Sequence, residues 1–183
     1  MSSASDLSKL LLTVSTDQFI QQCKDLAGLI MDASRKSKLI VLFGNGGSAA
    51  DAQHWAGELV CTYSNRERRP YPALALTCDS SIITAWSNDF EFTSIFSRQI
   101  HAYSGLIGLA IGLSTSGTSA NVLSGLKAAH ELGAKTVLIS GNKCDESDFA
   151  TSHVRFPTKE TPHIQTLTQV MYHQVCSVLD EES

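Results

Sequence analysis

Two loops of the sequence combine glycine with hydroxyl side chains in a way that suits phosphate binding. The first is Gly44-Asn45-Gly46-Gly47-Ser48 and the second is Ser114-Thr115-Ser116-Gly117-Thr118-Ser119. Glycine lets backbone N–H groups approach an anion, the N-terminus of a following helix adds a partial positive charge, and hydroxyl groups complete the oxygen shell. We therefore expect a phosphate group to bind at these loops.

Neither loop has the spacing of a common nucleotide-binding motif. No Gly-Lys-Ser or Gly-Lys-Thr follows the first loop, and its Asn-Gly-Gly order breaks the G-x-G-x-x-G pattern. Each loop could instead be a plain connection between a strand and a helix. That alternative is weaker for the second loop, which is richer in hydroxyl groups.

Two pairs of polar side chains have helical spacing. His54 and Glu58 are four residues apart on an expected helix, so they share one face about 6 Å apart and could be metal ligands, an acid and a base, or an exposed helix face. Gln165 and His173 are eight residues apart on the expected last helix, about 80° apart around its axis and about 12 Å along it, so they can line one cleft. A core position is the alternative for His173, because its neighbours are apolar.

The elements that must position these residues alternate between strand and helix. We expect strands at 38–43, 73–77, 109–113, 136–139 and 153–156, and helices at 49–59, 121–132 and from 161 to about 179, with a further segment at 79–86. This order predicts an α/β fold in three layers, with a five-stranded, mostly parallel, flavodoxin-like sheet. Two helices, the second capped by Asp17, should precede it within residues 1–36. Both loops then lie at the carboxyl ends of strands, where ligands bind.

Composition narrows the class of protein. The 183 residues suit one domain, residues 1–183, and 43% hydrophobic residues supply its core. The net charge of −4 disfavours binding to nucleic acid or to an anionic membrane, and no apolar run reaches the roughly 18 residues that span a bilayer. The N-terminus lacks the layout of a signal peptide, so we expect a cytosolic protein.

Five scattered cysteines without a C-x-x-C pair are expected to be reduced and mostly buried.

One short segment is dense in charge. Residues 64–70 read SNRERRP and separate an expected helix from an expected strand. Such a segment is typical of a solvated loop, and the alternative is an arm that contacts a phosphate or a partner.

Four motifs resemble those of the phosphoheptose isomerases, which belong to the sugar-isomerase (SIS) domain superfamily. They are GNGGSAADAQHWAGEL at 44–59, SNDF at 87–90, GLSTSGTSANV at 112–122, and Ile164-Gln165 followed by His173. The resemblance extends from about residue 7 to residue 180. It implies a cytosolic homotetramer with active sites between subunits, the N-terminal helical segment packing on the core and at the oligomer interface. Such an enzyme uses zinc and an enediol to interconvert sedoheptulose 7-phosphate and D-glycero-D-manno-heptose 7-phosphate.

The resemblance also implies roles for individual residues. Ser114, Thr115, Ser116 and Ser119 would hold the phosphate, and Asn45, Gly46, Gly47, Ser48, Asn88, Asp89 and Gln165 would complete the substrate site. Glu58 and His173 would be the acid/base pair. His54, Glu58, Gln165 and His173 would hold the zinc ion.

Two segments depart from the family pattern. Cys61-Thr62-Tyr63 stands where the family often has Gly-Arg-Tyr, so Arg66, Arg68 or Arg69 would have to replace a substrate-contacting arginine. Residues 161–168 read TPHIQTLT, where the family commonly has Ala-Asp-Arg-Ile-Gln-Glu-x-His, so the Asp, the Glu and the last His of that pattern are missing. An isomerase for another sugar phosphate is therefore an alternative. A further alternative is a non-catalytic member, either a tetrameric adaptor of the replication initiator or a sugar-phosphate sensor.

Overall fold

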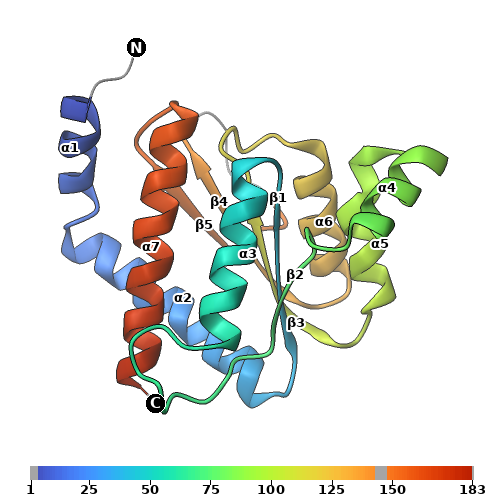
Figure 1. Cartoon of the computed structure of the whole chain (residues 1–183), viewed down its shortest axis with the longest axis horizontal. Coiled ribbons are helices and arrows are strands. Elements are labelled where there is room, and N and C mark those ends of the chain that lie inside the picture. The colour runs from blue at the N-terminus through green and yellow to red at the C-terminus, as the bar shows by residue number, and fades with distance from the viewer. Residues whose placement is uncertain (1–3, 143–147, 183) are drawn as a thin grey trace.

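The computed structural model describes residues 4–142 and 148–182. In chain order its elements are α1 (Ala4–Thr13), α2 (Asp17–Arg35), β1 (Leu39–Gly44), α3 (Gly47–Val60), β2 (Ala73–Ala75), α4 (Ser80–Asp89), a short 3-10 helix (Phe92–Ser94), α5 (Ile95–Ala102), β3 (Ile107–Leu113), α6 (Ala120–Glu131), β4 (Lys135–Gly141), β5 (Ser152–Phe156) and α7 (Thr161–Glu181). Figure 1 labels them in the same way.

The strands form one sheet in the order β2-β1-β3-β4-β5. All four strand pairs are parallel, where the sequence predicted a mostly parallel sheet, and the α/β class is confirmed. The chain leaves β1 toward β2 on one side and later returns to β3 on the other. This reversal opens a crevice at the carboxyl ends of β1 and β3, the place where ligands bind in open α/β sheets.

Alternation along the strands divides the core between the two faces of the sheet. Ile40 and Leu42 of β1 pack in a cluster with α2, α3 and α7, whereas Val41 and Phe43 pack in a second cluster with α5 and α6. Successive strand side chains point to opposite faces, so a buried run with both faces covered is apolar throughout. The three-layer arrangement is visible in Figure 1, with α2, α3 and α7 on one side and α4 to α6 on the other.

One local expectation was wrong, and one helix was not predicted. The N-cap of α2 is Thr16, whose Oγ1 accepts the Phe19 N–H over 3.2 Å, while Asp17 occupies the first turn. The sequence pattern did not indicate α5. That helix has only eight residues and is held by tertiary contacts, because Phe96 and Ile100 are buried and the Gln99 amide donates to the carbonyl of Leu76.

The expectation that the cysteines are mostly buried is wrong for two of the four that the structure describes. Cys23 and Cys176 are buried, but Cys61 and Cys78 are exposed, because one ends α3 and the other precedes α4. All four are free, and Cys144 lies outside the described residues. Among the helices of the described ranges, none has both the length and the apolar character that crossing a membrane requires.

Candidate functional site

The two glycine- and hydroxyl-containing loops lie side by side because their strands pair. Phe43 is in register with Gly112, and Gly44 with Leu113, so β1 and β3 end together. Between the loops is a cavity of about 280 Å³. It is lined by Asn45, Gly46, Gly47, Ser48, Leu113, Ser114, Thr115, Ser119, Thr161 and Gln165. Eight of these ten are predicted substrate residues, while Leu113 and Thr161 were not predicted.

The first loop requires a glycine immediately before helix α3. Gly46 has φ 54°, a left-handed conformation that disfavours residues with a Cβ, and α3 begins at the next residue. The N-terminus of α3 thus forms one wall of the cavity, and its partial positive charge favours an anion there.

Hydroxyl groups hold the second loop in shape. Ser114 is buried, and its Oγ donates to Ser119 Oγ over 2.8 Å while accepting the Ser119 N–H over 3.3 Å. Ser116 is not among the cavity residues; its Oγ accepts from the N–H and the hydroxyl of Thr118. Ser116 therefore supports the turn, and Ser114 and Ser119 present oxygen atoms to the cavity.

A pair of amides joins the two loops. Asn45 Nδ2 donates to Asn121 Oδ1 over 2.8 Å, and Asn121 Nδ2 donates back to Asn45 Oδ1 over 2.8 Å. Asn121 is buried in the first turn of α6 and was not among the predicted site residues. Its partner is 76 residues away in the sequence, so no local pattern pointed to it.

The N-terminal end of α7 closes the cavity. A Cβ added to Gly47 would lie 2.2 Å from the Gln165 amide nitrogen, so glycine lets Gln165 approach the first loop closely. Thr161 Oγ1 is 3.3 Å from Thr115 Oγ1 and joins α7 to the second loop. Pro162 lies in the first turn of this helix, where the missing backbone N–H costs no hydrogen bond.

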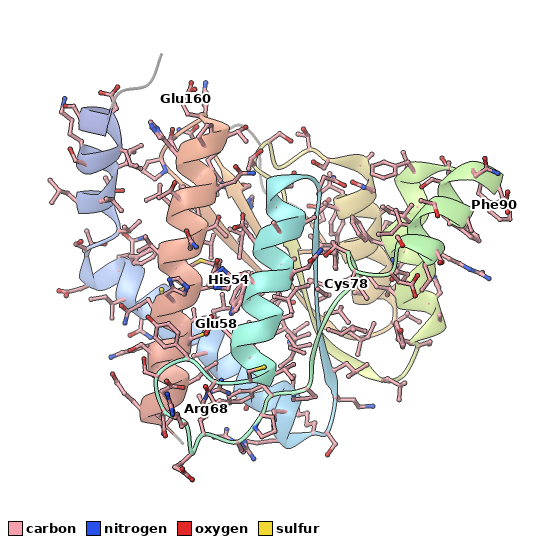
Figure 2. All side chains as sticks on the ribbon, in the orientation of Figure 1. His54, Glu58, Arg68, Cys78, Phe90 and Glu160 are labelled. Carbon is pink, nitrogen blue, oxygen red and sulfur yellow. The ribbon has the colours of Figure 1, made fainter. Side chains whose placement is uncertain are left out.

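Farther along the same two helices is a cluster of titratable groups. One donor atom each of His54, Glu58 and His173 lies within 4.8 Å of the others, and His54 Nε2 is 3.2 Å from Glu58 Oε1. Figure 2 shows His54 and Glu58 on α3, beside α7. The i,i+4 spacing thus places the α3 pair on one face, and helix packing brings His173 of α7 to it.

Burial shifts the pKa of one histidine of this cluster and of a nearby carboxyl group. The pKa of His173 is lowered chiefly by burial and then by His54, with Glu58 opposing, so neutral imidazole is favoured. Burial also raises the pKa of Asp51, against the charge of His54. Asp51 was not predicted, although it lies three residues before His54 on the same helix.

The cluster has the donor chemistry of a metal site. Two imidazoles and a carboxylate are a donor set that zinc uses in catalytic sites, where a fourth position stays open. Gln165, the fourth predicted ligand, lines the cavity between the loops. The residues present therefore fit a divalent ion such as zinc.

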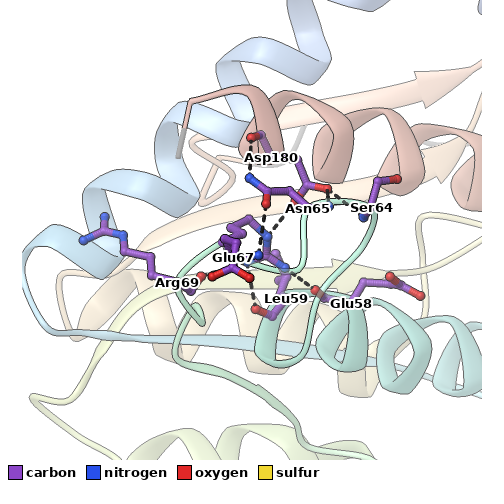
Figure 3. A network of polar contacts seen from close by, with 8 residues as sticks. Glu58, Leu59, Ser64, Asn65, Glu67, Arg69 and Asp180 are labelled. Carbon is purple, nitrogen blue, oxygen red and sulfur yellow. Dashed lines mark hydrogen bonds and ion pairs between the residues drawn. The ribbon is translucent and has the colours of Figure 1, made fainter.

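The charge-dense segment is anchored rather than freely solvated. Arg68 is 4% exposed, and its Nε donates to Asp180 Oδ1 over 2.7 Å. Its terminal nitrogens donate to the carbonyls of Glu58, Leu59 and Arg69, and Asp180 Oδ2 accepts the N–H groups of Ser64 and Asn65 (Figure 3). The guanidinium is thus engaged inside the chain, so Arg68 is not free to replace the family arginine.

Two predicted substrate residues lie elsewhere within this chain. Asn88 and Asp89 end α4, are exposed, and bond to each other over 2.8 Å. Neither lines the cavity between the loops. Phe90, the next residue, projects far from His54 and Glu58 in Figure 2.

Comparisons with known proteins agree with this architecture. A family model described as SIS domain matches residues 5–141. Phosphoheptose isomerase of Aquifex aeolicus (strain VF5) is 46% identical over 164 residues, covering 89% of this chain and 85% of that protein. The structure of phosphoheptose isomerase GmhA from Neisseria gonorrhoeae is similar with a TM-score of 0.86 at 30% identity, covering 97% of this chain and 94% of that one. A phosphoheptose isomerase from Francisella tularensis has a TM-score of 0.83 at 26% identity, with the same coverage of 97% and 94%. The chain therefore belongs to the SIS domain family and, within it, to the phosphoheptose isomerases, a family of phosphosugar isomerase enzymes.

Proposed function

We propose that this chain interconverts sedoheptulose 7-phosphate and D-glycero-D-manno-heptose 7-phosphate. The observation that carries the proposal is the cluster of His54, Glu58 and His173 on the same two helices that wall the cavity between the loops. Ser48 precedes His54 by six residues, about 9 Å along α3. Such a site suits a sugar whose phosphate and carbonyl lie at opposite ends of its carbon chain.

The phosphate group is assigned to the second loop. Ser114, Thr115 and Ser119 supply hydroxyl groups to the cavity, and Ser116 holds the turn that presents them. Asn45, Gly46, Gly47 and Ser48 complete the shell on the other side, together with the N-terminus of α3. The cavity thus has many hydrogen-bond donors and binds a dianion without a lysine.

Glu58 and His173 are assigned the proton transfers. Going from ketose to aldose, a base removes a proton from C1, the electron pair forms the C1–C2 double bond of an enediol, and the proton returns to C2. A second group moves a proton between the oxygens on C1 and C2. A carboxylate and a neutral imidazole are suited to these two tasks, and the lowered pKa of His173 favours its neutral form.

A zinc ion is the proposed cofactor. His54, Glu58 and His173 would hold it, with Gln165 as a fourth ligand. When bound, zinc supplies Lewis-acid polarisation of a carbonyl oxygen. The same side chains remain responsible for orienting the sugar and for moving its protons.

A homotetramer with active sites between subunits, located in the cytosol, completes the proposal. Its support within the chain is α4, which has no buried residue and carries exposed Ile82, with Phe90 and Phe92 exposed just beyond it. Asn88 and Asp89 end the same helix, so an interface there would carry them to a neighbouring subunit's site.

Another phosphorylated sugar is the second candidate. It is favoured by the engagement of Arg68 with Asp180, because this ion pair removes one of the three arginines on the segment that could replace the family's substrate arginine. Arg66 and Arg69 are exposed and remain candidates.

Proton NMR of the purified protein with sedoheptulose 7-phosphate tests the proposal. We expect anomeric signals of an aldoheptose 7-phosphate, suppressed by a chelator and restored by zinc. If a chelator leaves turnover unchanged, the proposal that the reaction requires zinc is contradicted. Binding without any product would contradict the heptose reaction and favour another sugar phosphate, an adaptor or a sensor.

A further inference from the structure

A buried tyrosine contacts the candidate site from the side of the core. Tyr172 of α7 is fully buried, and its hydroxyl lies 2.8 Å from His54 Nδ1. The other ring nitrogen of His54, Nε2, is 3.2 Å from Glu58 Oε1. The imidazole of His54 is thus held at both nitrogens.

Aromatic packing leaves the tyrosine little freedom. Its ring stacks on Trp55 with centroids 5.5 Å apart and 21° between the planes, and Trp55 is itself fully buried. The ring also meets His54 and His173 edge-on, at 5.2 and 4.8 Å. Because a ring packed in this way cannot swing, its hydroxyl marks a fixed point beside His54.

The imidazole of His54 needs a fixed hydrogen-bond partner to keep one orientation. The side chain is exposed, and a half-turn about the Cβ–Cγ bond would put the carbon Cδ2 in the place of Nδ1 and the carbon Cε1 in the place of Nε2. A tyrosine hydroxyl can accept a hydrogen bond from Nδ1–H, which leaves a lone pair on Nε2. Ligating histidines generally have a partner of this kind on their other nitrogen.

We propose that Tyr172 is a positioning residue that holds His54 with Nε2 facing Glu58 and His173. This proposal rests on the proposed function for its relevance to catalysis, but the contact itself does not depend on the substrate. Tyr172 contacts the rings of both His54 and His173, so the role assigned to it is to set their geometry and not to transfer a proton to the sugar.

The substitution Tyr172→Phe removes only the hydroxyl and keeps the packed ring. In the full-length protein we expect zinc affinity, measured by competition with a chromophoric chelator, to fall 10- to 100-fold, the range typical for loss of such a partner. The absorption spectrum of the cobalt-loaded protein should change as well. Binding of inorganic phosphate, which depends on the loops, should stay within twofold of the unsubstituted protein.

The matched control is Tyr71→Phe. Tyr71 is 2% exposed, and its ring lies under the Arg68 guanidinium, 5.0 Å from its carbon, outside the cluster. This variant should leave zinc affinity and the cobalt spectrum unchanged. Equal losses in both variants would show a general structural effect and overturn the proposal.

A metal-free measurement separates this proposal from the proposed function. Long-range proton–nitrogen NMR reports which ring nitrogen of His54 carries hydrogen, with His54→Gln identifying its signals. Tyr172→Phe should change these signals and Tyr71→Phe should not. Unchanged His54 signals in Tyr172→Phe would refute the positioning role even in an active isomerase. Changed signals in a protein that does not convert heptose phosphates would support the role and contradict the function.

Discussion

The side chains of Arg68 and Asp180 form an ion pair of 2.7 Å with 1% and 8% of their surfaces exposed. The pair joins the segment after α3 to the last turn of α7, and Arg68 also donates to the Glu58 and Leu59 carbonyls. It therefore ties together the ends of the two helices that carry Glu58 and His173.

The first prediction concerns this pair. Asp180→Ala would leave Arg68 buried without its carboxylate and would free the Ser64 and Asn65 N–H groups, so we expect a loss of about 3–5 kcal/mol in the free energy of unfolding. Urea unfolding at fixed protein concentration measures it. The control is Asp32→Ala, which removes an exposed pair with Arg35 and should cost about 1 kcal/mol or less. Similar losses in both variants would contradict the anchoring role.

Glu58→Gln should abolish turnover while leaving phosphate binding intact. The amide keeps the size of the side chain but can neither accept the substrate's proton nor carry charge, so kcat should fall by at least about 100-fold. Steady-state kinetics and calorimetry with inorganic phosphate measure the two effects. Glu131→Gln, on the exposed face of α6, is the control. An active Glu58→Gln enzyme would refute the assigned role.

Ser119→Ala should weaken binding of a phosphate ester. The hydroxyl lines the cavity, and its loss removes a hydrogen bond to a charged group, worth about 1.5–3 kcal/mol, or roughly 10- to 150-fold in the dissociation constant. Ser116→Ala should also weaken binding, through the turn that it supports. Ser124→Ala on α6, whose hydroxyl bonds to Ser97, should not. Unchanged affinity in Ser119→Ala would place the phosphate elsewhere.

Gly47→Ala should impair activity more than stability. The new Cβ would collide with the Gln165 amide, the end of a flexible side chain that can move away, so the melting temperature should change little. Displacing Gln165 from the cavity should lower kcat/KM. In contrast, Gly57→Ala adds a methyl group to open space in the same helix and should stabilise the protein by about 1 kcal/mol without affecting kinetics. A Gly47→Ala enzyme with unchanged kinetics would show that Gln165 is dispensable.

Thiol reactivity should follow burial. Burial raises the pKa of Cys23 from 9.0 to about 12, so this thiol stays protonated and inert at pH 8, whereas exposed Cys61 and Cys78 should be alkylated. The pKa of Cys23 is higher in the folded than in the unfolded protein, so the protonated thiol contributes to the free energy of unfolding. This contribution is complete below about pH 9 and is lost as the pH rises toward 12. Peptide mapping by mass spectrometry checks the reactivity. Alkylation of Cys23 at the rate of Cys61 would contradict its burial.

Much of the fold could be predicted from the sequence because the relevant signals are local. The apolar run that forms β1, the glycine turn after it and the helical pattern of α3 are contiguous, and β3 and its hydroxyl-rich loop repeat the same order. A parallel sheet then places both loops at the same edge; they meet because β1 and β3 are neighbours in the observed strand order. The i,i+4 spacing of His54 and Glu58 likewise follows from helix geometry alone.

Other features depend on contacts between distant segments. Asn45 meets Asn121 across 76 residues, Arg68 meets Asp180 across 112, and His54 meets Tyr172 across 118. A buried polar group can have its partner anywhere in the chain, and only packing decides which one reaches it. The sequence alone thus determined the succession of strands and loops along the chain and the helical spacing of the candidate site residues, because these are local properties, while the resemblance to a family supplied their expected roles. The tertiary structure decided the partners that hold each site residue in place, because those partners come together only when α3, α6 and α7 pack on the sheet.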